Sequence, residues 1–262
     1  MRSPVKPKKS LGQHFLRDLD IARRIADTVE AYNGMPVLEV GPGTGVLTQF
    51  LIAAQHDLTV VELDRESVAY LRANFKALDG RIIEQDFLRL RLDEIFPDRF
   101  CVIGNYPYNI SSQIFFKVLD YKDRIPCCSG MIQKEVAERM AARPGSKTYG
   151  ILSVLMQAWY DIEYLFTVPE HVFEPPPKVK SAVIRMTRNG VAALDCDERL
   201  FRQVVKTSFN QRRKTLRNSL RPMLGKECPL LEQPIFDKRP EQLSVAEFVS
   251  LTREIEPHIT TP

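Results

Sequence analysis

The sequence has few of the features that would place a protein in a membrane, outside the cell or around a metal ion. It has no run of about 18 apolar residues, and its basic start, MRSPVKPKKS, is not followed by an apolar stretch. Five cysteines occur without C-x-x-C spacing, and four histidines are scattered without a ligand-like pattern. We therefore expect a cytosolic protein with reduced thiols, no membrane association and no bound metal.

Acidic residues are missing from two segments of a chain whose overall charge is nearly balanced. The net charge is +4, yet Leu200–Arg221 contains seven lysines and arginines and no acid, and the first ten residues contain four more. Each segment alone is consistent with an ordinary solvated surface. Together with the chemistry described below, the two segments favour contact with a polyanion.

The 262 residues, 44% of them hydrophobic, are enough for one large domain and a small one. From residue 35 onward, short apolar runs alternate with segments of helical periodicity, which is typical of a parallel sheet with crossover helices. Seven strands are predicted, at 35–40, 57–63, 81–86, 99–105, 129–134, 162–168 and 181–187. The predicted fold class is therefore α/β.

The strand pattern stops near residue 188. Residues 188–198 are polar and irregular, and three helical stripes follow, at 201–209, 216–220 and 244–255. We therefore predict two domains, an α/β domain at residues 1–188 and a helical domain at residues 189–262.

A glycine-rich loop, EVGPGTG at 39–45, follows the first predicted strand. Glycines at such a turn let the backbone approach a ligand closely and adopt angles that other residues avoid. Nicotinamide dinucleotides require G-x-G-x-x-G, but the glycines here are spaced G-x-G-x-G and are followed by Val46. This spacing favours S-adenosylmethionine as the ligand.

Two carboxylates stand at the ends of the next two predicted strands. Glu62 can accept hydrogen bonds from both hydroxyls of a ribose, and Asp86 can accept one from an adenine amino group. Strand-end carboxylates cost solvation unless they are paired, so a purely structural role is the alternative for both. Their order behind Gly41 and its loop favours cofactor binding.

The fourth predicted strand ends in NYPY, Asn105 to Tyr108. An adenine amine is a poor nucleophile, and two acceptors on its two N–H bonds would aim its lone pair at a methyl donor. Asn105 can supply one oxygen, and the carbonyl of Tyr106 or Pro107 can supply the other. Pro107 can fix the turn, and Tyr108 can stack on the base. An ordinary turn with a buried tyrosine is the alternative.

A second aromatic residue, Phe173, precedes three prolines in FEPPPKVKS at 173–181. The prolines make this loop stiff, and a stiff loop holds an aromatic ring in place. A Phe173 ring facing Tyr108 would sandwich an adenine extruded from its stack. The alternative is a loop anchored by one buried phenylalanine.

Several motifs together resemble one family closely. KSLGQHFL, EVGPGTG, Glu62, QDF, GNYPYNIS, QKEVAERM, FEPPPKVKS and FNQRRKTLRNSL are similar to the small-subunit (16S) ribosomal RNA adenine dimethyltransferases of the KsgA/RsmA type. The match spans Lys9 to the last predicted helix. The resemblance implies a Rossmann-like seven-stranded S-adenosylmethionine-dependent methyltransferase sheet, with the last strand antiparallel, and a small C-terminal helical domain that binds ribosomal RNA.

The enzyme implied by the resemblance is an S-adenosylmethionine-dependent rRNA (adenine-N6,N6)-dimethyltransferase. It would place two methyl groups on each of two adjacent adenosines in a hairpin loop near the 3′ end of 16S rRNA. The partner would be 16S rRNA within the small ribosomal subunit, late in its biogenesis. We expect a monomer.

Carried over by position, the resemblance gives residues three roles. Cofactor binding falls to His14, Leu16, Gly41, Glu62, Asp86 and Asn105. Catalysis and handling of the base fall to Asn105, Pro107, Tyr108 and Phe173. RNA phosphates would be met by Lys8, Lys9, Arg212, Arg213, Lys214 and Arg217.

The chain departs from the family pattern at two positions. Leucine is common in the family at the position of Tyr106, and asparagine is frequent at the position of His14. We expect Tyr106 either to narrow the pocket or to pack against the helical domain, and activity to survive because the backbone matters more there. Histidine at position 14 can still donate to a cofactor carboxylate.

Two other functions are compatible with the same fold. A non-catalytic small-subunit assembly factor would keep the fold without methylating, although the retained Gly41, Glu62, Asp86, Asn105 and Tyr108 disfavour it. A large-subunit rRNA adenine dimethylase of the antibiotic-resistance type shares the catalytic motif. The three prolines after Phe173 and the NQRRKTLRNSL segment favour the small-subunit branch.

Overall fold

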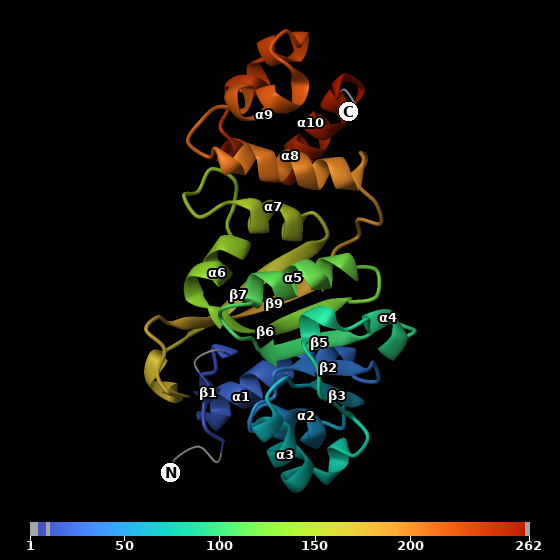
Figure 1. Cartoon of the computed structure of the whole chain (residues 1–262), viewed down its shortest axis with the longest axis vertical. Helices are drawn as coiled ribbons and strands as arrows, with labels where there is room; N and C mark the ends of the chain where they lie inside the picture. The colour runs from blue at the N-terminus through green and yellow to red at the C-terminus, as the bar shows by residue number, and fades with distance from the viewer. Residues whose placement is uncertain (1–4, 9–10, 260–262) are drawn as a thin grey trace. The chain divides into compact units, whose positions relative to one another are not determined.

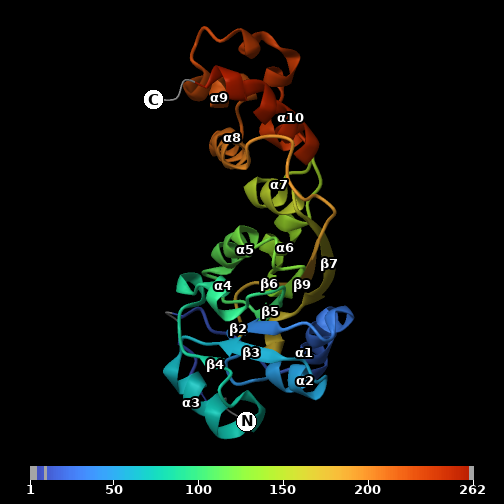
Figure 2. The same cartoon turned by 90° about the vertical axis from the view of Figure 1, so that its right-hand side faces the viewer.

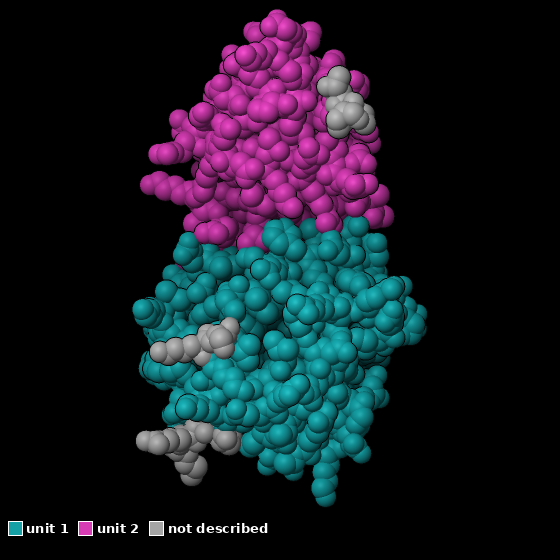
Figure 3. Space-filling model, in the orientation of Figure 1, with its two compact units in different colours: residues 1–137, 162–188 teal, residues 138–161, 189–262 magenta. Residues whose placement is uncertain are grey.

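The computed structural model describes residues 5–8 and 11–259 of the chain. The chain forms two compact units, which Figure 3 colours separately: unit 1 is Met1–Ala137 with Ile162–Arg188, and unit 2 is Glu138–Asp161 with Asn189–Pro262. Residues 189–262, predicted as a separate helical domain, therefore belong to unit 2 together with residues 138–161. No helix in the described ranges is long and apolar enough to cross a membrane.

A seven-stranded sheet carries the α/β part of the fold (Figure 1). In spatial order its strands are β4 (Ile82–Ile83), β3 (Leu58–Val61), β2 (Val37–Val40), β5 (Cys101–Asn105), β6 (Cys127–Gln133), β9 (Ser181–Arg188) and β7 (Tyr160–Val168). The pairs from β4 to β6 are parallel, and β9 runs antiparallel to β6. The seven predicted strands and the antiparallel last strand are thereby confirmed.

Helices cover both faces of this sheet. Figure 2 shows α1 (Leu19–Ala26) and α2 (Thr48–Ala53) on one side and α5 (Ser111–Asp120) on the other. Every residue of β2 and β3 is buried, as expected for a parallel sheet covered on both faces. This burial explains why these strands read as continuous apolar runs rather than as alternating patterns.

Two helices of unit 1 begin at aspartates whose side chains cap them. Asp18 accepts hydrogen bonds from two backbone amides at the start of α1, and Asp64 caps α3 (Arg65–Asn74). The remaining helices that begin in this unit are α4 (Leu92–Ile95) and α6 (Lys134–Met140). Since α3 begins just beyond β3, its cap lies beside the strand-end carboxylate Glu62.

Unit 2 is helical in its described part. It contains α7 (Ile151–Gln157), α8 (Glu198–Asn210), α9 (Leu216–Leu224) and α10 (Val245–Ile255). The predicted stripes pack together as its core, in which Phe201, Leu220 and Phe248 are fully buried. Trp159 meets Phe201 edge to face, with 6.0 Å between the ring centroids.

A second, two-stranded sheet was not predicted from the sequence. β1 (Phe15–Leu16) pairs antiparallel with β8 (Phe173–Glu174), and Leu16 lies opposite Phe173 in the register. This pair joins the KSLGQHFL segment to the FEPPPKVKS loop. It therefore holds two motifs that are far apart in the sequence beside each other.

Candidate active site

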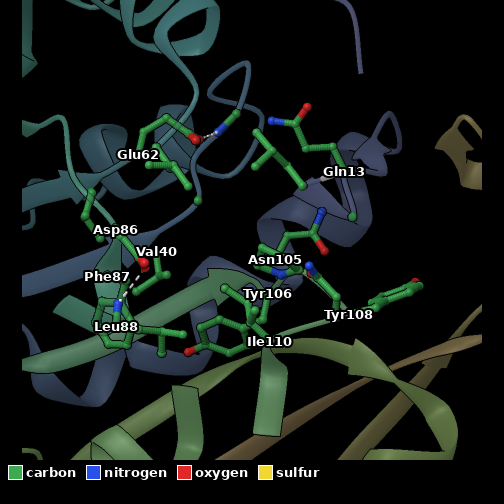
Figure 4. A pocket seen from close by; sticks show the side chains of 18 of the residues that line it. Gln13, Val40, Glu62, Asp86, Phe87, Leu88, Asn105, Tyr106, Tyr108 and Ile110 are labelled. Atoms are coloured by element: carbon green, nitrogen blue, oxygen red, sulfur yellow. Dashed lines mark hydrogen bonds between the residues drawn. The ribbon is translucent and has the colours of Figure 1, made fainter. Parts of the chain in front are cut away.

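A cavity of about 180 Å³ opens at the carboxyl ends of the parallel strands in unit 1 (Figure 4). In a parallel α/β sheet this edge is where ligands bind. The cavity is lined by the glycine loop, the Glu62 and Asp86 segments, the NYPY turn and residues 11–15. The fold thus brings five of the sequence motifs to one place.

The three glycines of EVGPGTG have different surroundings. All have positive φ angles, +70° at Gly41, +55° at Gly43 and +77° at Gly45. A Cβ atom on Gly41 would meet nothing closer than 3.9 Å, whereas a Cβ on Gly45 would lie 2.4 Å from the Phe75 ring. Gly41 therefore keeps space open at the cavity, and Gly45 allows close packing of the loop on α3.

Glu62 lies at the wall of the cavity directly after β3 and is 6% exposed. One carboxylate oxygen accepts a hydrogen bond from the backbone amide of Gly43 at 3.0 Å (Figure 4). The other accepts one from the backbone amide of Asp64 at 2.9 Å. Burial raises the pKa of Glu62 above its ordinary value, while these amide bonds act in the opposite direction. Glu62 thus ties the glycine loop to the start of α3 and retains acceptor capacity for a ligand.

Asp86 lines the cavity but lies beyond the strand that was expected to end with it. β4 covers only Ile82–Ile83 because its single partner in the sheet, β3, ends at Val61. Asp86 instead caps the short 3-10 turn Phe87–Arg89 and accepts a hydrogen bond from the Leu88 amide at 2.9 Å. Its second oxygen makes only a long ion pair, 3.7 Å, to the exposed Arg89.

Asn105 is the last residue of β5, and its side chain has a fixed orientation. Its amide nitrogen donates to the backbone carbonyl of His14 at 3.1 Å. This bond turns the Asn105 side-chain oxygen, which was predicted to accept a hydrogen bond from the target amine, away from the His14 carbonyl. Pro107 follows in the cavity wall, and its own carbonyl accepts from the Ile110 amide at 3.3 Å.

Tyr108 and His14 lie against each other at the cavity. Their ring centroids are 5.3 Å apart with an interplanar angle of 29°, and the Tyr108 hydroxyl makes a short hydrogen bond with Ser181. Burial raises the pKa of Tyr108, so the phenol stays protonated at neutral pH. His14 Nδ1 donates to the Pro175 carbonyl at 2.8 Å, and in the neutral ring Nε2 is then an acceptor. Donation from the His14 ring to a cofactor carboxylate would therefore need the imidazolium form.

Two of the residues predicted to bind the cofactor or the target base lie outside this cavity. Phe173 is 2% exposed and Leu16 is 4% exposed, and both belong to the hydrophobic core of unit 1. Leu16 borders a separate small cavity of about 30 Å³ behind the glycine loop. The structure thus does not place the Phe173 ring opposite Tyr108, and the predicted base sandwich stays a prediction.

The predicted RNA-binding residues differ in what they already contact. Arg212 donates to the carbonyls of Ser146 and Lys147, and Arg217 pairs with Asp237 at 2.9 Å. Arg213 and Lys214, which stand between these two arginines, are exposed.

Of the two N-terminal lysines predicted to bind RNA, the structure describes only Lys8. Lys8 donates to Asp64 and lies 3.1 Å from Glu66, and Gln13 also donates to Asp64, so Lys8 fastens the N-terminal segment to the start of α3. Burial acts to raise the pKa of Asp64, but these two partners hold it below its ordinary value. Lys9 lies outside the described residues.

Sequence reasoning missed Glu39, which is 1% exposed and lies at the small cavity behind the glycine loop. Burial raises the pKa of Glu39 to about 8, although the Thr48 hydroxyl donates to it at 2.7 Å. The signal was present, because a carboxyl inside an apolar strand beside glycines is unusual. Gln13, Leu88 and Ile110 also line the main cavity and have no such signal, since polar or apolar residues are common in these loops.

Metal ligands are not gathered anywhere in the described residues, where no group of three His, Cys, Asp or Glu side chains is placed to hold an ion. Cys101, Cys127 and Cys128 are buried free thiols inside β5 and β6. The polar side chains that line the cavity are carboxylates, amides, phenols and an imidazole.

Comparison with known proteins assigns this arrangement to a family. The family model for ribosomal RNA adenine dimethylases matches residues 5–255. The chain belongs to this family. Among curated adenine dimethylases, the ribosomal RNA small subunit methyltransferase A of Parabacteroides distasonis is 73% identical over 97% of this chain and 96% of its own length. The protein of the same name from Bacteroides thetaiotaomicron is 68% identical over 98% of this chain and 97% of its own length.

Solved structures of adenine dimethylases and related enzymes confirm the fold. A dimethyladenosine transferase from Plasmodium falciparum aligns with a TM-score of 0.79 at 23% identity, covering 94% of this chain and 98% of that chain. The 23S rRNA methyltransferase ErmE aligns with a TM-score of 0.67 at 27% identity, covering 92% of this chain and 99% of that chain. The much higher identity to small-subunit methyltransferases favours that branch of the family over the large-subunit alternative.

Proposed function

We propose that this adenine dimethylase transfers two methyl groups from S-adenosylmethionine to the 6-amino group of each of two adjacent adenosines near the 3′ end of 16S rRNA. It would act on the small ribosomal subunit late in its assembly, in the cytoplasm, as a monomer. The observation that carries the proposal is the single cavity at which the glycine loop, Glu62, Asp86 and the NYPY turn meet.

The cavity residues fit S-adenosylmethionine, which supplies an electrophilic methyl group. The absence of a side chain at Gly41 leaves room in the cavity for the cofactor. Glu62 and Asp86 can each accept further hydrogen bonds there. In this proposal Glu62 binds the ribose hydroxyls and Asp86 binds the adenine amine of the cofactor. His14 and Leu16 would contact the cofactor from the N-terminal segment that packs on the glycine loop.

The NYPY turn supplies acceptors for the target amine. The Asn105 side-chain oxygen would accept one N6–H bond, because the Asn105 nitrogen is held by His14. The Pro107 carbonyl is already engaged with Ile110, so the Tyr106 carbonyl is the better second acceptor. Gripped in this way, the nitrogen is pyramidal and its lone pair faces the methyl group. A general base is not required, since the proton can pass to water after transfer.

Tyr108 would stack on the target base in place of, or beside, its present contact with His14. Phe173 would reach the opposite face of the base only if its ring left the core and the β1–β8 pair opened. The roles of Tyr108 and Phe173 are therefore coupled to the segment that carries His14.

Arg213 and Lys214 are the strongest candidates in unit 2 for contacts to RNA phosphates, because their side chains are exposed. Arg212 would act by holding the 146–147 carbonyls, and Arg217 by its pair with Asp237. Lys8 would support the cofactor side of the site rather than meet RNA first.

Methyl transfer to purified ribosomal subunits tests the proposed substrate. Small and large subunits from a strain lacking both modifications would be incubated with the protein and labelled S-adenosylmethionine. Label is expected in 16S rRNA alone. Label in 23S rRNA would favour the large-subunit alternative, and subunit binding without label would favour a non-catalytic assembly factor.

A further inference from the structure

The side chain of Tyr106 occupies a socket that exists because two neighbouring strand positions are glycine. A Cβ atom on Gly104 would lie 3.0 Å from the Tyr106 ring, and a Cβ on Gly130 would lie 2.7 Å from it. The same atoms would lie 2.5 Å from the Val40 carbonyl oxygen and 2.1 Å from the Gly104 carbonyl oxygen. Adjacent β5 and β6 are thus shaped to receive an aromatic ring from the NYPY turn.

Tyr106 does not lie on the surface of unit 1, because the residue is 1% exposed, and it is among the residues that line the cavity. Its edge packs against Phe115 of α5, with 5.6 Å between the ring centroids and an angle of 75°. Its hydroxyl donates to the Ser129 carbonyl at 2.7 Å and lies 3.3 Å from the Cys128 sulfur. Burial raises the pKa of Tyr106 well above its ordinary value, so the hydroxyl remains a donor.

These contacts hold Tyr106 through both its backbone amide and its side chain. The Tyr106 amide donates to the Met131 carbonyl at 3.0 Å, while the Tyr106 side chain is tied to Ser129 on the same strand. A peptide plane is rigid, so the direction of the Tyr106 carbonyl follows from the position of its Cα atom and of Pro107. A shift of the Tyr106 Cα atom, which the ring contacts oppose, would therefore move this carbonyl.

We propose that Tyr106 is a positioning residue whose hydroxyl bond to Ser129 holds the Tyr106 carbonyl where it accepts an N6–H bond of the target adenine. This inference rests on the proposed role of the NYPY turn. In each transfer the N6–C bond forms while the sulfur–methyl bond breaks, the electron pair returns to sulfur and one N6 proton passes to water. Small errors in the placement of an acceptor lower the rate of such a step by large factors.

The second methylation depends more strongly on this carbonyl than the first. After one transfer only one N6–H bond remains, so the two acceptors can no longer share the alignment of the nitrogen. When the first methyl group lies on the Asn105 side, the remaining N6–H faces only the Tyr106 carbonyl, and Asn105 cannot compensate for a displaced carbonyl. Loss of the Tyr106 hydroxyl should consequently raise the proportion of monomethylated product.

The test compares Tyr106→Phe with Tyr121→Phe and Asn105→Ala in steady-state methylation of unmodified small subunits. Tyr121 is a suitable control because its hydroxyl donates to Asp93 at 3.2 Å in the same unit and does not line the cavity. We expect Tyr106→Phe to lower kcat about tenfold with the KM for S-adenosylmethionine within about twofold, and to accumulate monomethyladenosine. Tyr121→Phe should keep the native kcat and product ratio.

Native kcat and product ratio in Tyr106→Phe would overturn the inference. So would a Tyr121→Phe protein that loses kcat and accumulates monomethyladenosine to the same extent as Tyr106→Phe. Should Tyr106→Phe unfold at the assay temperature, the same comparison is made at a lower temperature at which its circular dichroism matches that of the native protein, and the expected product ratio is unchanged. Full activity of Asn105→Ala would instead refute the proposed role of the NYPY turn itself. The two failures are thereby distinguished.

Discussion

Glu62 combines a structural task with a proposed role in cofactor binding. Its carboxylate holds the amides of Gly43 and Asp64 and is proposed to bind a ribose. Glu62→Gln keeps the size but loses the charge and one acceptor, and a hydrogen bond to a charged group contributes about 1.5–3 kcal/mol. We expect the Kd for S-adenosylmethionine, measured by calorimetry, to rise by roughly tenfold to a hundredfold. An unchanged Kd would remove Glu62 from the cofactor site.

Glu39 makes the stability of the protein depend on pH in the alkaline direction. Its pKa of about 8 in the folded protein lies above the ordinary value of 4.5, so between these values the folded state binds more protons than the unfolded state. The contribution of Glu39 to the free energy of unfolding is therefore fully present below about pH 4.5. It is lost as the pH rises to about 8, by about 1.4 kcal/mol per pH unit at most.

Glu39→Gln should remove this dependence. Urea unfolding between pH 6 and 9 is expected to show a native protein that loses stability more steeply with rising pH than the variant does. Glu30→Gln, at an exposed position of the same unit, serves as the control for loss of a carboxylate. Parallel pH profiles for the native protein and Glu39→Gln would show that Glu39 is ionised in the folded state.

The cavity residues that belong to sequence motifs could be predicted, whereas the residues that orient them through long-range contacts could not. Gly41, Glu62, Asp86, Asn105 and Tyr108 follow strands that could be read from apolar runs, so their meeting at one sheet edge follows from topology. The partners that orient them come from far along the chain. The bond between Asn105 and the His14 carbonyl spans 91 residues, and no local pattern specifies it.

The glycine loop divides its work between binding and packing. A Cβ on Gly41 would meet Pro107 only at the ordinary contact distance of 3.9 Å, whereas a Cβ on Gly45 would lie 2.4 Å from the Phe75 ring. Gly45→Ala should lower the free energy of unfolding by about 1–3 kcal/mol through the clash and the positive φ. Gly41→Ala shares the strain of a positive φ without the clash, so it should be less destabilised but should lose more affinity for S-adenosylmethionine. Thermal unfolding and calorimetry on both variants check this, and the reverse ranking would contradict it.

Strands and helices were predictable to the extent that their burial is regular. The strands β2 and β3 are buried throughout, and α8 has one apolar stripe, so their patterns are unambiguous. β4 was predicted too long, because an edge strand stops where its partner stops and not where its apolar run ends. β1 and β8 have two residues each and pair across more than 150 positions, which is too short for any periodicity to appear.

At the scale of the whole molecule, the exposed basic residues should govern how strongly the affinity for RNA depends on salt concentration. Each phosphate contact contributes close to one unit to the slope of log K against log salt. Arg213→Ala combined with Lys214→Ala is expected to lower that slope for small-subunit RNA by about 1 to 2 units. The exposed Lys76 of unit 1 provides the control, and Lys76→Ala should leave the slope unchanged. Equal slopes in all three proteins would place the RNA contact elsewhere.

The central claim is that the cavity dimethylates an RNA adenine and that Asn105 takes part in the transfer. The most direct test digests 16S rRNA from unmodified small subunits after reaction and measures the nucleosides by mass, with native protein and Asn105→Ala side by side. We expect N6,N6-dimethyladenosine with the native protein and at most traces with Asn105→Ala. Monomethyladenosine alone from the native protein, or equal dimethylation by the variant, would contradict it.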